Sequence, residues 1–201
     1  MKNKDWVGNT NSVYKIIGAS NHAIDANRDI HDFYATSASV LDPLKAKFDI
    51  PKNIVEPMAG DGHLSKKLIE MGHNVISYDI IERNYPLDKV VDFFQVKEIP
   101  KGYSILTNPA YKIAKETVLH ALELVEDGQF VIMFLKTTFL EGKARYNELF
   151  SKHPPKYVYV FVERQICAKG GDFENVKSSA VSYSFFVWEK GWDGNTTIGW
   201  I

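Results

Sequence analysis

The chain has 201 residues, of which 45 % are apolar, and a formal net charge of −1. This length can bury a substantial core and predicts a single globular domain. The apolar runs are too short to span a bilayer and the N-terminus has no apolar signal segment, so we expect a soluble protein that is not secreted. The single cysteine, Cys167, excludes an intrachain disulfide and a thiolate zinc cluster, which fits a reducing compartment.

Charge is unevenly distributed along the chain. Residues 136–177 carry eight Lys or Arg against five Asp or Glu, a local surplus of three in a chain otherwise at −4. A near-neutral total does not by itself indicate a nucleic-acid binder, and a basic stretch is often only a solvated face.

The first 30 residues are polar and show no sustained apolar period. We therefore expect residues 1–30 to form an irregular arm and residues 31–201 to form the domain. A short helix is predicted next, capped by Ser37 or Ser39, with its apolar positions at Val40, Leu41, Leu44 and Phe48.

From residue 52 onward, predicted strands alternate with helices. The strands are expected at 52–57, 74–80, 89–94, 103–108 and 129–136, and the main helices at 64–73 and 111–128. The second helix places Ile113, Val118, Ala121, Leu122 and Val125 on one face. After a polar helix around 141–150, the last strands at 156–163 and 181–188 follow each other directly. This order predicts an α/β fold with a mostly parallel seven-stranded sheet, an antiparallel C-terminal strand pair and helices on both faces.

Polar residues gather where four of these strands end. Ligands of such sheets bind at the carboxyl ends of the strands, which here carry Glu56 to Gly62, Asp79, Asp92, and Asn108 to Tyr111. The loop "GDGHLS" lacks the third glycine of a dinucleotide fingerprint, because Ser65 stands in its place. Glu56 would also repel a pyrophosphate, so a phosphate ligand is disfavoured.

Four carboxylates, those of Glu56, Asp61, Asp79 and Asp92, would instead suit a ligand that carries positive charge and ribose hydroxyls. S-adenosylmethionine fits that description, with Asp79 accepting from the ribose and Asp92 from the adenine amine while Phe93 packs on the base. The glycines would let the backbone approach such a ligand closely. Asp79 as a helix cap and "GDG" as an ordinary turn are the alternative interpretations.

Several short motifs resemble one known family. "IVEPMAGDG" resembles the cofactor loop of class I S-adenosylmethionine-dependent methyltransferases, and "TNPAY" resembles the Asn-Pro-Pro-Tyr signature of those that methylate DNA adenine. "DFYATS" is similar to the segment that precedes the cofactor loop in that family. "SYSFFVWEKGW" and "IGWI" resemble the end of small phage-type adenine methyltransferases. The resemblance covers roughly residues 30 to 201 and implies a Rossmann-like fold.

The resemblance also implies roles for individual residues. It implies a catalytic group formed by Asn108, Pro109 and Tyr111, in which the Asn108 side chain and the Pro109 carbonyl orient the substrate amine. Tyr111 would stack on an adenine flipped out of the duplex. It implies a cofactor site formed by Tyr34, Thr36, Glu56, Met58, Ala59, Gly60, Gly62, Asp79, Ile80, Asp92, Phe93 and Asn108. DNA contacts are expected from Tyr111, Lys143, Arg145, Arg164, Lys169 and Phe173.

Two features depart from the family pattern. Ala110 replaces the second proline, so φ at that position is no longer fixed covalently. No separate target-recognition domain is evident, and only the segments 140–156 and 164–180, with the arm, could read DNA.

Two other functions therefore stay open. One is methylation of RNA or of a protein glutamine amide, and the other is a cofactor-binding protein that has lost catalysis and acts by binding DNA or a protein. The histidines show no metal-ligand spacing, so no metal site is expected. The resemblance implies the cytoplasm of a bacterial or phage-infected cell.

Overall fold

The computed structural model describes residues 34–165, 167–169 and 181–201. The predicted arm at 1–30 lies outside the described residues. In this part of the chain, no helix combines the length and the apolar character needed to cross a bilayer.

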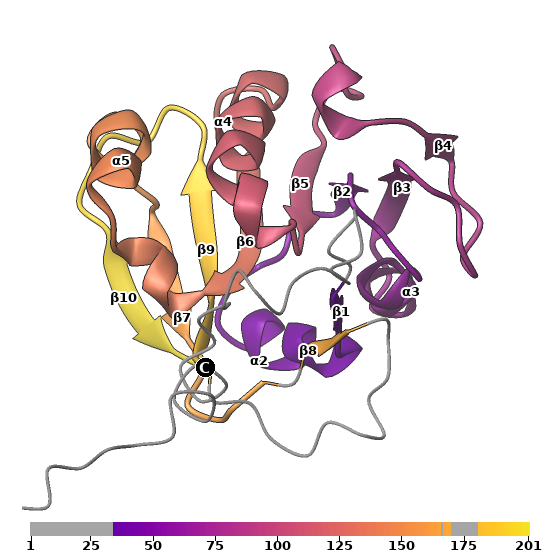
Figure 1. Cartoon of the computed structure of the whole chain (residues 1–201), viewed down its shortest axis with the longest axis horizontal. Coiled ribbons are helices and arrows are strands. Elements are labelled where there is room, and N and C mark those ends of the chain that lie inside the picture. Colours follow the sequence, from indigo (N-terminus) through magenta and orange to yellow (C-terminus); the bar gives the residue numbers. More distant parts are fainter. Residues whose placement is uncertain (1–33, 166, 170–180) are drawn as a thin grey trace, which may run out of the picture.

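One eight-stranded sheet forms the centre of the structure, in the order β10-β7-β9-β6-β5-β2-β3-β4 (Figure 1). Strands β2 to β6 run parallel to one another, while β9 runs antiparallel to both β6 and β7. The strands are β2 (Asn53–Glu56), β3 (Asn74–Asp79), β4 (Lys89–Val90), β5 (Ser104–Thr107), β6 (Phe130–Lys136), β7 (Tyr157–Val160), β9 (Tyr183–Glu189) and β10 (Thr197–Trp200). The predicted α/β class, the mostly parallel sheet and the antiparallel C-terminal pairing are confirmed.

Two details of the predicted sheet are wrong. The sheet has eight strands rather than seven, because the short segment Thr197–Trp200 adds a mostly exposed edge strand, parallel to β7. The third predicted strand, 89–94, shrinks to Lys89–Val90 because Asp92 starts the 3-10 helix η3 (Phe93–Gln95).

The two faces of the sheet bury separate apolar clusters. Alternate residues of the central strands point to opposite faces, so that Val55 and Ile105 enter one cluster and Ile54 and Leu106 the other. Helix α4 (Ala114–Leu124) covers the first face, and α2 (Leu41–Lys45) and α3 (His63–Glu70) cover the second. The expectation of helices on both faces is confirmed, and burial on both sides explains the continuous apolar run of β6.

The helix ends differ from the sequence prediction in two places. Ser37 and Ser39 bond to each other through their Oγ atoms at 2.7 Å, instead of capping the helix that follows. Ile113 precedes α4, in the 3-10 helix η4 (Tyr111–Ile113), and is 36 % exposed, so it is not part of the buried helix face.

The remaining elements connect or flank the sheet. The predicted polar helix around 141–150 is present as α5 (Lys143–Arg145) and the π-helix η6 (Tyr146–Phe150). The 3-10 helices η2 (Ala38–Val40) and η5 (Thr137–Leu140) precede α2 and α5, respectively. A second, two-stranded antiparallel sheet joins β1 (Tyr34–Thr36) to β8 (Cys167–Lys169), and Figure 1 shows it beside α2 and α3.

Candidate active site

The strand order creates a switch point between β2 and β5. From β2 the chain first builds outward through β3 to β4 and then returns to the other side of β2 to form β5 and β6. In open parallel sheets the loops diverge at such a point and leave a crevice at the carboxyl ends of the strands. The loop after β2 carries Gly60 and Gly62, and the loop after β5 carries Asn108 to Tyr111.

The glycine loop is a tight turn fixed to the end of β3. Gly60 and Gly62 have φ of 57° and 72°, in the left-handed region where side chains are disfavoured. The Gly60 amide donates to Asp79 Oδ2 at 2.8 Å, and the Ala59 amide donates to the Tyr78 carbonyl at 2.9 Å. These two hydrogen bonds attach the glycine loop to the end of β3.

Asp79 lies at the point where a ribose-binding carboxylate was expected. It is 7 % exposed, and its Oδ1 accepts from the Ile81 amide at 3.1 Å and from Arg83 Nη1 at 3.3 Å. With Gly60 as the partner of Oδ2, the carboxylate already orients the glycine loop. An ionised carboxylate offers about four acceptor positions, so capacity remains for a hydroxyl group.

Glu56 contributes less negative charge than the sequence suggested. The side chain is 2 % exposed and accepts a hydrogen bond from Ser65 Oγ, which lies 2.7 Å from Ser77 Oγ. Burial raises the pKa of Glu56 to about 8; the Ser65 hydrogen bond opposes this rise and the charge of Asp79 adds to it. The carboxyl group is therefore mostly protonated at neutral pH, until a nearby cation lowers its pKa.

The segment between β3 and β4 supports the glycine loop. The sequence analysis did not predict this supporting role. Arg83 bonds Asp79, and Asn84 Nδ2 donates to Asp61 Oδ1 at 3.3 Å. A Cβ on Gly62 would lie only 2.2 Å from the Tyr85 ring, so this ring occupies the space that a side chain would need. Only the tertiary packing of Tyr85 identifies this contact.

The two residues expected at the adenine behave differently from each other. Asp92 caps η3 by accepting from the Phe94 amide at 3.0 Å. The Phe93 ring is 2 % exposed and packs edge-on to His120 at a centroid distance of 4.9 Å. The start of η3 turns Phe93 into the core, where its ring packs against His120, and its contact with an adenine stays a prediction.

The Asn-Pro-Ala-Tyr segment follows β5 without a break. Asn108 is partly exposed and donates through Nδ2 to Thr36 Oγ1 at 2.6 Å, and Pro109 is buried. Ala110 has φ of −58° and ψ of 125°, and this φ lies within the range that a proline ring would impose. The second proline of the motif is absent, but the backbone keeps the conformation that proline would fix.

Tyr111 borders a lysine that the sequence analysis did not select. Lys136 ends β6, the strand next to β5, and its Nζ lies 4.7 Å from the centre of the Tyr111 ring. The ring centre of Tyr183 lies 6.3 Å from that of Tyr111. The sequence pattern that could have identified Lys136 is a charged residue at the end of an otherwise apolar central strand.

The other predicted residues are scattered. Met58 and Ala59 lie in the glycine loop, whereas Ile80 is 49 % exposed. Tyr34 and Lys169 lie in the β1–β8 pair, but their side chains, like Phe173 as a whole, lie outside the described residues.

The residues on and near α5 that were predicted to contact DNA differ in their surroundings. Arg145 Nε donates to the Phe139 carbonyl at 2.8 Å, and its guanidinium also bonds the Glu141 carbonyl and stacks on Phe139. These bonds close the turn before α5, so Arg145 has a structural role, and its contact with DNA stays a prediction. Lys143 and Arg164 are exposed.

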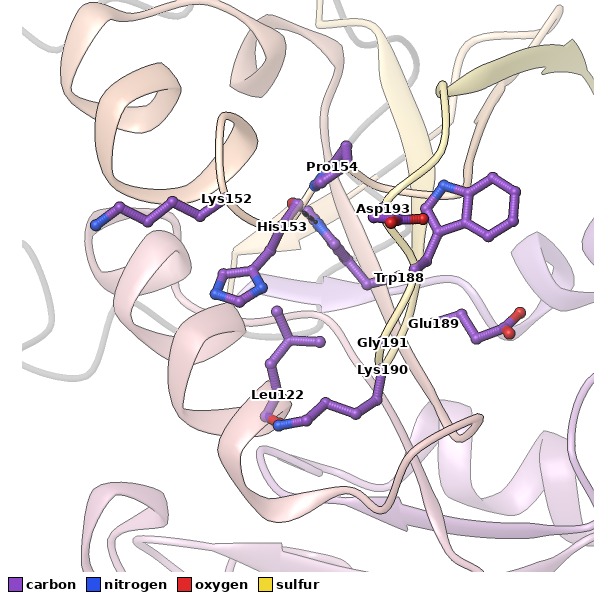
Figure 2. Close-up of a pocket in the computed structure, with 10 residues that line it drawn as sticks. Leu122, Lys152, His153, Pro154, Trp188, Glu189, Lys190, Gly191 and Asp193 are labelled. Atoms are coloured by element: carbon purple, nitrogen blue, oxygen red, sulfur yellow. Dashed lines mark hydrogen bonds between the residues drawn. The ribbon is translucent and has the colours of Figure 1, made fainter.

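A hollow of about 270 Å³ lies at a different edge of the sheet (Figure 2). Leu122, His153, Trp188 and Trp192 are among its lining residues. Because β9 is antiparallel and Glu189 pairs with Phe130, the first residue of β6, this hollow lies where the parallel strands begin. It is therefore separate from the glycine loop and Asn108. Within the described ranges, no group of His, Cys, Asp or Glu is arranged to hold a metal ion.

The strand order and the switch-point loops define a Rossmann-like α/β fold. No protein-family model matches the sequence, and no curated protein is significantly similar to it. Among solved structures, a proposed RNA methyltransferase from Pyrococcus horikoshii is similar with a TM-score of 0.55 and 15 % identity, over 76 % of this chain and 82 % of that one.

Proteins with quite different names share the fold. A proposed hemolysin from Lactococcus lactis has a TM-score of 0.56 and 9 % identity, over 81 % of this chain and 91 % of that one. The type IIG restriction endonuclease BpuSI has a TM-score of 0.50 and 16 % identity, over 77 % of this chain but only 25 % of that one. At these identities the likeness establishes the fold, and the function must be argued from the site.

Proposed function

We propose that this protein transfers a methyl group from S-adenosylmethionine to the exocyclic 6-amino group of adenine in DNA. The observation that carries the proposal is the placement of the Asn-Pro-Ala-Tyr segment and the glycine loop on the two sides of one switch point. One loop can hold an amine and the other a cationic nucleoside, with the crevice between them.

The residues of the first loop fit the cofactor. Gly60 and Gly62 form a tight turn beside the Asp79 carboxylate, which keeps an acceptor position for a ribose hydroxyl. Glu56 lies behind the loop, where a positive charge would favour loss of its proton. When bound, S-adenosylmethionine supplies a methyl group on a positively charged sulfur.

The residues of the second loop fit an amine on a planar ring. The lone pair of such an amine is delocalised, so it is a weak nucleophile. Hydrogen bonds from the amine to Asn108 Oδ1 and to the Pro109 carbonyl would hold it in line and favour the positive charge that develops on nitrogen. No base is needed at the start, because the nitrogen loses its proton only after it has become cationic.

Tyr111 and Lys136 support a nucleic acid as the substrate. Tyr111 supplies a flat ring for stacking, which would offset part of the cost, a few kcal/mol, of flipping a base out of a duplex. Lys136 Nζ lies over that ring, 4.7 Å from its centre, and a stacking base would displace it toward the phosphates. A neutral glutamine amide has no use for such a charge, so the protein-substrate alternative is disfavoured.

Ala110 motivates the alternative of a binding protein that has lost catalysis. Its proline-like φ weakens that alternative, because the acceptor geometry does not depend on the missing ring.

Transfer of tritiated methyl groups to unmethylated DNA, to RNA and to total protein, measured in parallel, tests the proposal. We expect label in DNA. Label confined to RNA or protein would replace the proposed substrate, and cofactor binding without transfer to any acceptor would favour the binding-protein alternative.

A further inference from the structure

Thr36 makes a buried contact with the amide of Asn108. Asn108 Nδ2 donates to Thr36 Oγ1 at 2.6 Å, across 72 residues of sequence. Thr36 is 3 % exposed, so water does not compete effectively for this hydrogen bond. The hydroxyl expected to contact the cofactor is directed to the amide instead.

The orientation of this amide matters for the chemistry. An asparagine side chain carries an acceptor at one end and two donors at the other. A substrate amine donates its protons, so it can bond Oδ1 but would meet only donors if the amide were turned around. In this structure the NH₂ end bonds Thr36 Oγ1, which directs Oδ1 away from Thr36. Because a hydroxyl can also donate, this bond restrains the plane of the amide rather than choosing its acceptor end.

The backbone of Thr36 is fixed from outside the main sheet. Thr36 pairs with Cys167 and Tyr34 with Lys169 in the antiparallel β1–β8 ribbon. Two segments far apart in sequence therefore fix the backbone of Thr36, and Figure 1 shows β1 and β8 next to α3 and α2.

We propose that Thr36 is a positioning residue that holds the Asn108 amide in place for the substrate amine. This inference rests on the proposed function, because it assigns to Thr36 a role in the same transfer step. A positioning role predicts that loss of the Thr36 hydroxyl lowers kcat, whereas a cofactor contact predicts that it raises the Kd of S-adenosylmethionine.

The variants Thr36→Val and Thr36→Ser separate these roles. Valine has nearly the same shape but no hydroxyl, whereas serine keeps the hydroxyl and loses only a methyl group. We expect Thr36→Val to lower kcat about tenfold, the typical value of one hydrogen bond, with the Kd of S-adenosylmethionine within about twofold of wild type. Thr36→Ser should keep kcat within about threefold.

Two results would overturn the inference. One is weaker cofactor binding by Thr36→Val with unchanged kcat at saturation, which would make Thr36 a cofactor ligand. The other is an equal loss of kcat in the valine and serine variants, which would point to packing of the methyl group rather than to the hydroxyl.

A measurement without substrate keeps the inference testable if the wild type proves inactive. The side-chain NH₂ signals of Asn108, assigned by their loss in Asn108→Ala, should show slow hydrogen exchange in wild type and Thr36→Ser. Thr36→Val should exchange at least about tenfold faster. Protection that survives in Thr36→Val would contradict the positioning role, whatever the protein methylates.

Discussion

Ala110 shows that a motif can lose a residue and keep its geometry. Its φ of −58° matches the value that a proline ring fixes. Replacing it with proline should therefore reduce the freedom of the unfolded chain without straining the folded one. We expect Ala110→Pro to raise the free energy of unfolding by about 0.4–1 kcal/mol, measured by urea denaturation, and to retain methyl transfer.

A destabilised Ala110→Pro variant would show that the Ala110 amide or the Pro109 backbone needs a conformation that proline forbids. Ala110→Gly is the matched control. It increases the backbone freedom at residue 110 and should lower both the free energy of unfolding and methyl transfer.

Lys136 gives the candidate site its positive charge. If its ammonium contacts a phosphate, Lys136→Gln should weaken DNA binding and reduce the slope of log affinity against log salt concentration by about one. Lys101 is exposed and precedes β5 at the opposite edge of the sheet, so Lys101→Gln should change neither quantity. Equal effects of the two variants, in a titration of a fluorescent duplex, would assign the change to overall charge.

The packing of the glycine loop against the segment between β3 and β4 depends on one close contact. Gly62 has φ of 72° and faces the Tyr85 ring, whereas Gly72 has φ of 91° and, among the described residues, has no atom near the position of a Cβ. Alanine at either site carries the cost of a left-handed backbone, but only Gly62→Ala also displaces the ring.

We therefore expect Gly62→Ala to be roughly 1–3 kcal/mol more destabilising than Gly72→Ala and to weaken cofactor binding, whereas Gly72→Ala should leave binding unchanged. Thermal unfolding and calorimetric titration would measure the two effects. Equal destabilisation would mean that Tyr85 moves aside without cost.

The buried Glu56, Ser65 and Ser77 connect β2, α3 and β3 and make stability depend on pH. The pKa of Glu56 is about 8 in the folded chain against an ordinary 4.5, so the folded state binds more protons between these values. Its free energy of unfolding should accordingly fall as the pH rises through this window.

Glu56→Gln should flatten this dependence, by roughly 2–4 kcal/mol between pH 5 and pH 8, because the amide stays neutral. Urea denaturation across this range provides the test. A wild type whose stability rises with pH, relative to the variant, would show that Glu56 is ionised in the folded protein.

Local patterns predicted the elements that depend on local chemistry. The apolar run before "GDG" and the amphipathic segment after it predicted β2, the glycine loop and α3. The surroundings of Phe93 and Arg145 were not predicted. Phe93 packs against His120, which is distant in the sequence, and Arg145 bonds a backbone carbonyl, which no residue type reveals. For the same reason the roles of Tyr85 and Lys136 were missed.

At the scale of the whole molecule, the sheet order brings two sequence motifs about 50 residues apart to adjacent strands, β2 and β5. Alternation of strands and helices was enough to predict this class of sheet, because parallel strands require crossovers that fix the edge at which their loops meet. The partners of Thr36 could not be predicted, since β1 is too short to carry a periodic signal and pairs with a segment near the other end of the chain.

The central claim is that Asn108 holds an adenine amine for methylation. The most direct measurement is mass spectrometry of nucleosides released from unmethylated duplex DNA after incubation with S-adenosylmethionine, for wild type and Asn108→Ala. We predict 6-methyldeoxyadenosine with wild type and at least a hundredfold less with the variant, whose cofactor affinity should stay within about threefold of wild type. Methylated adenine at equal levels from both proteins, or a methyl group on another base, would contradict the account.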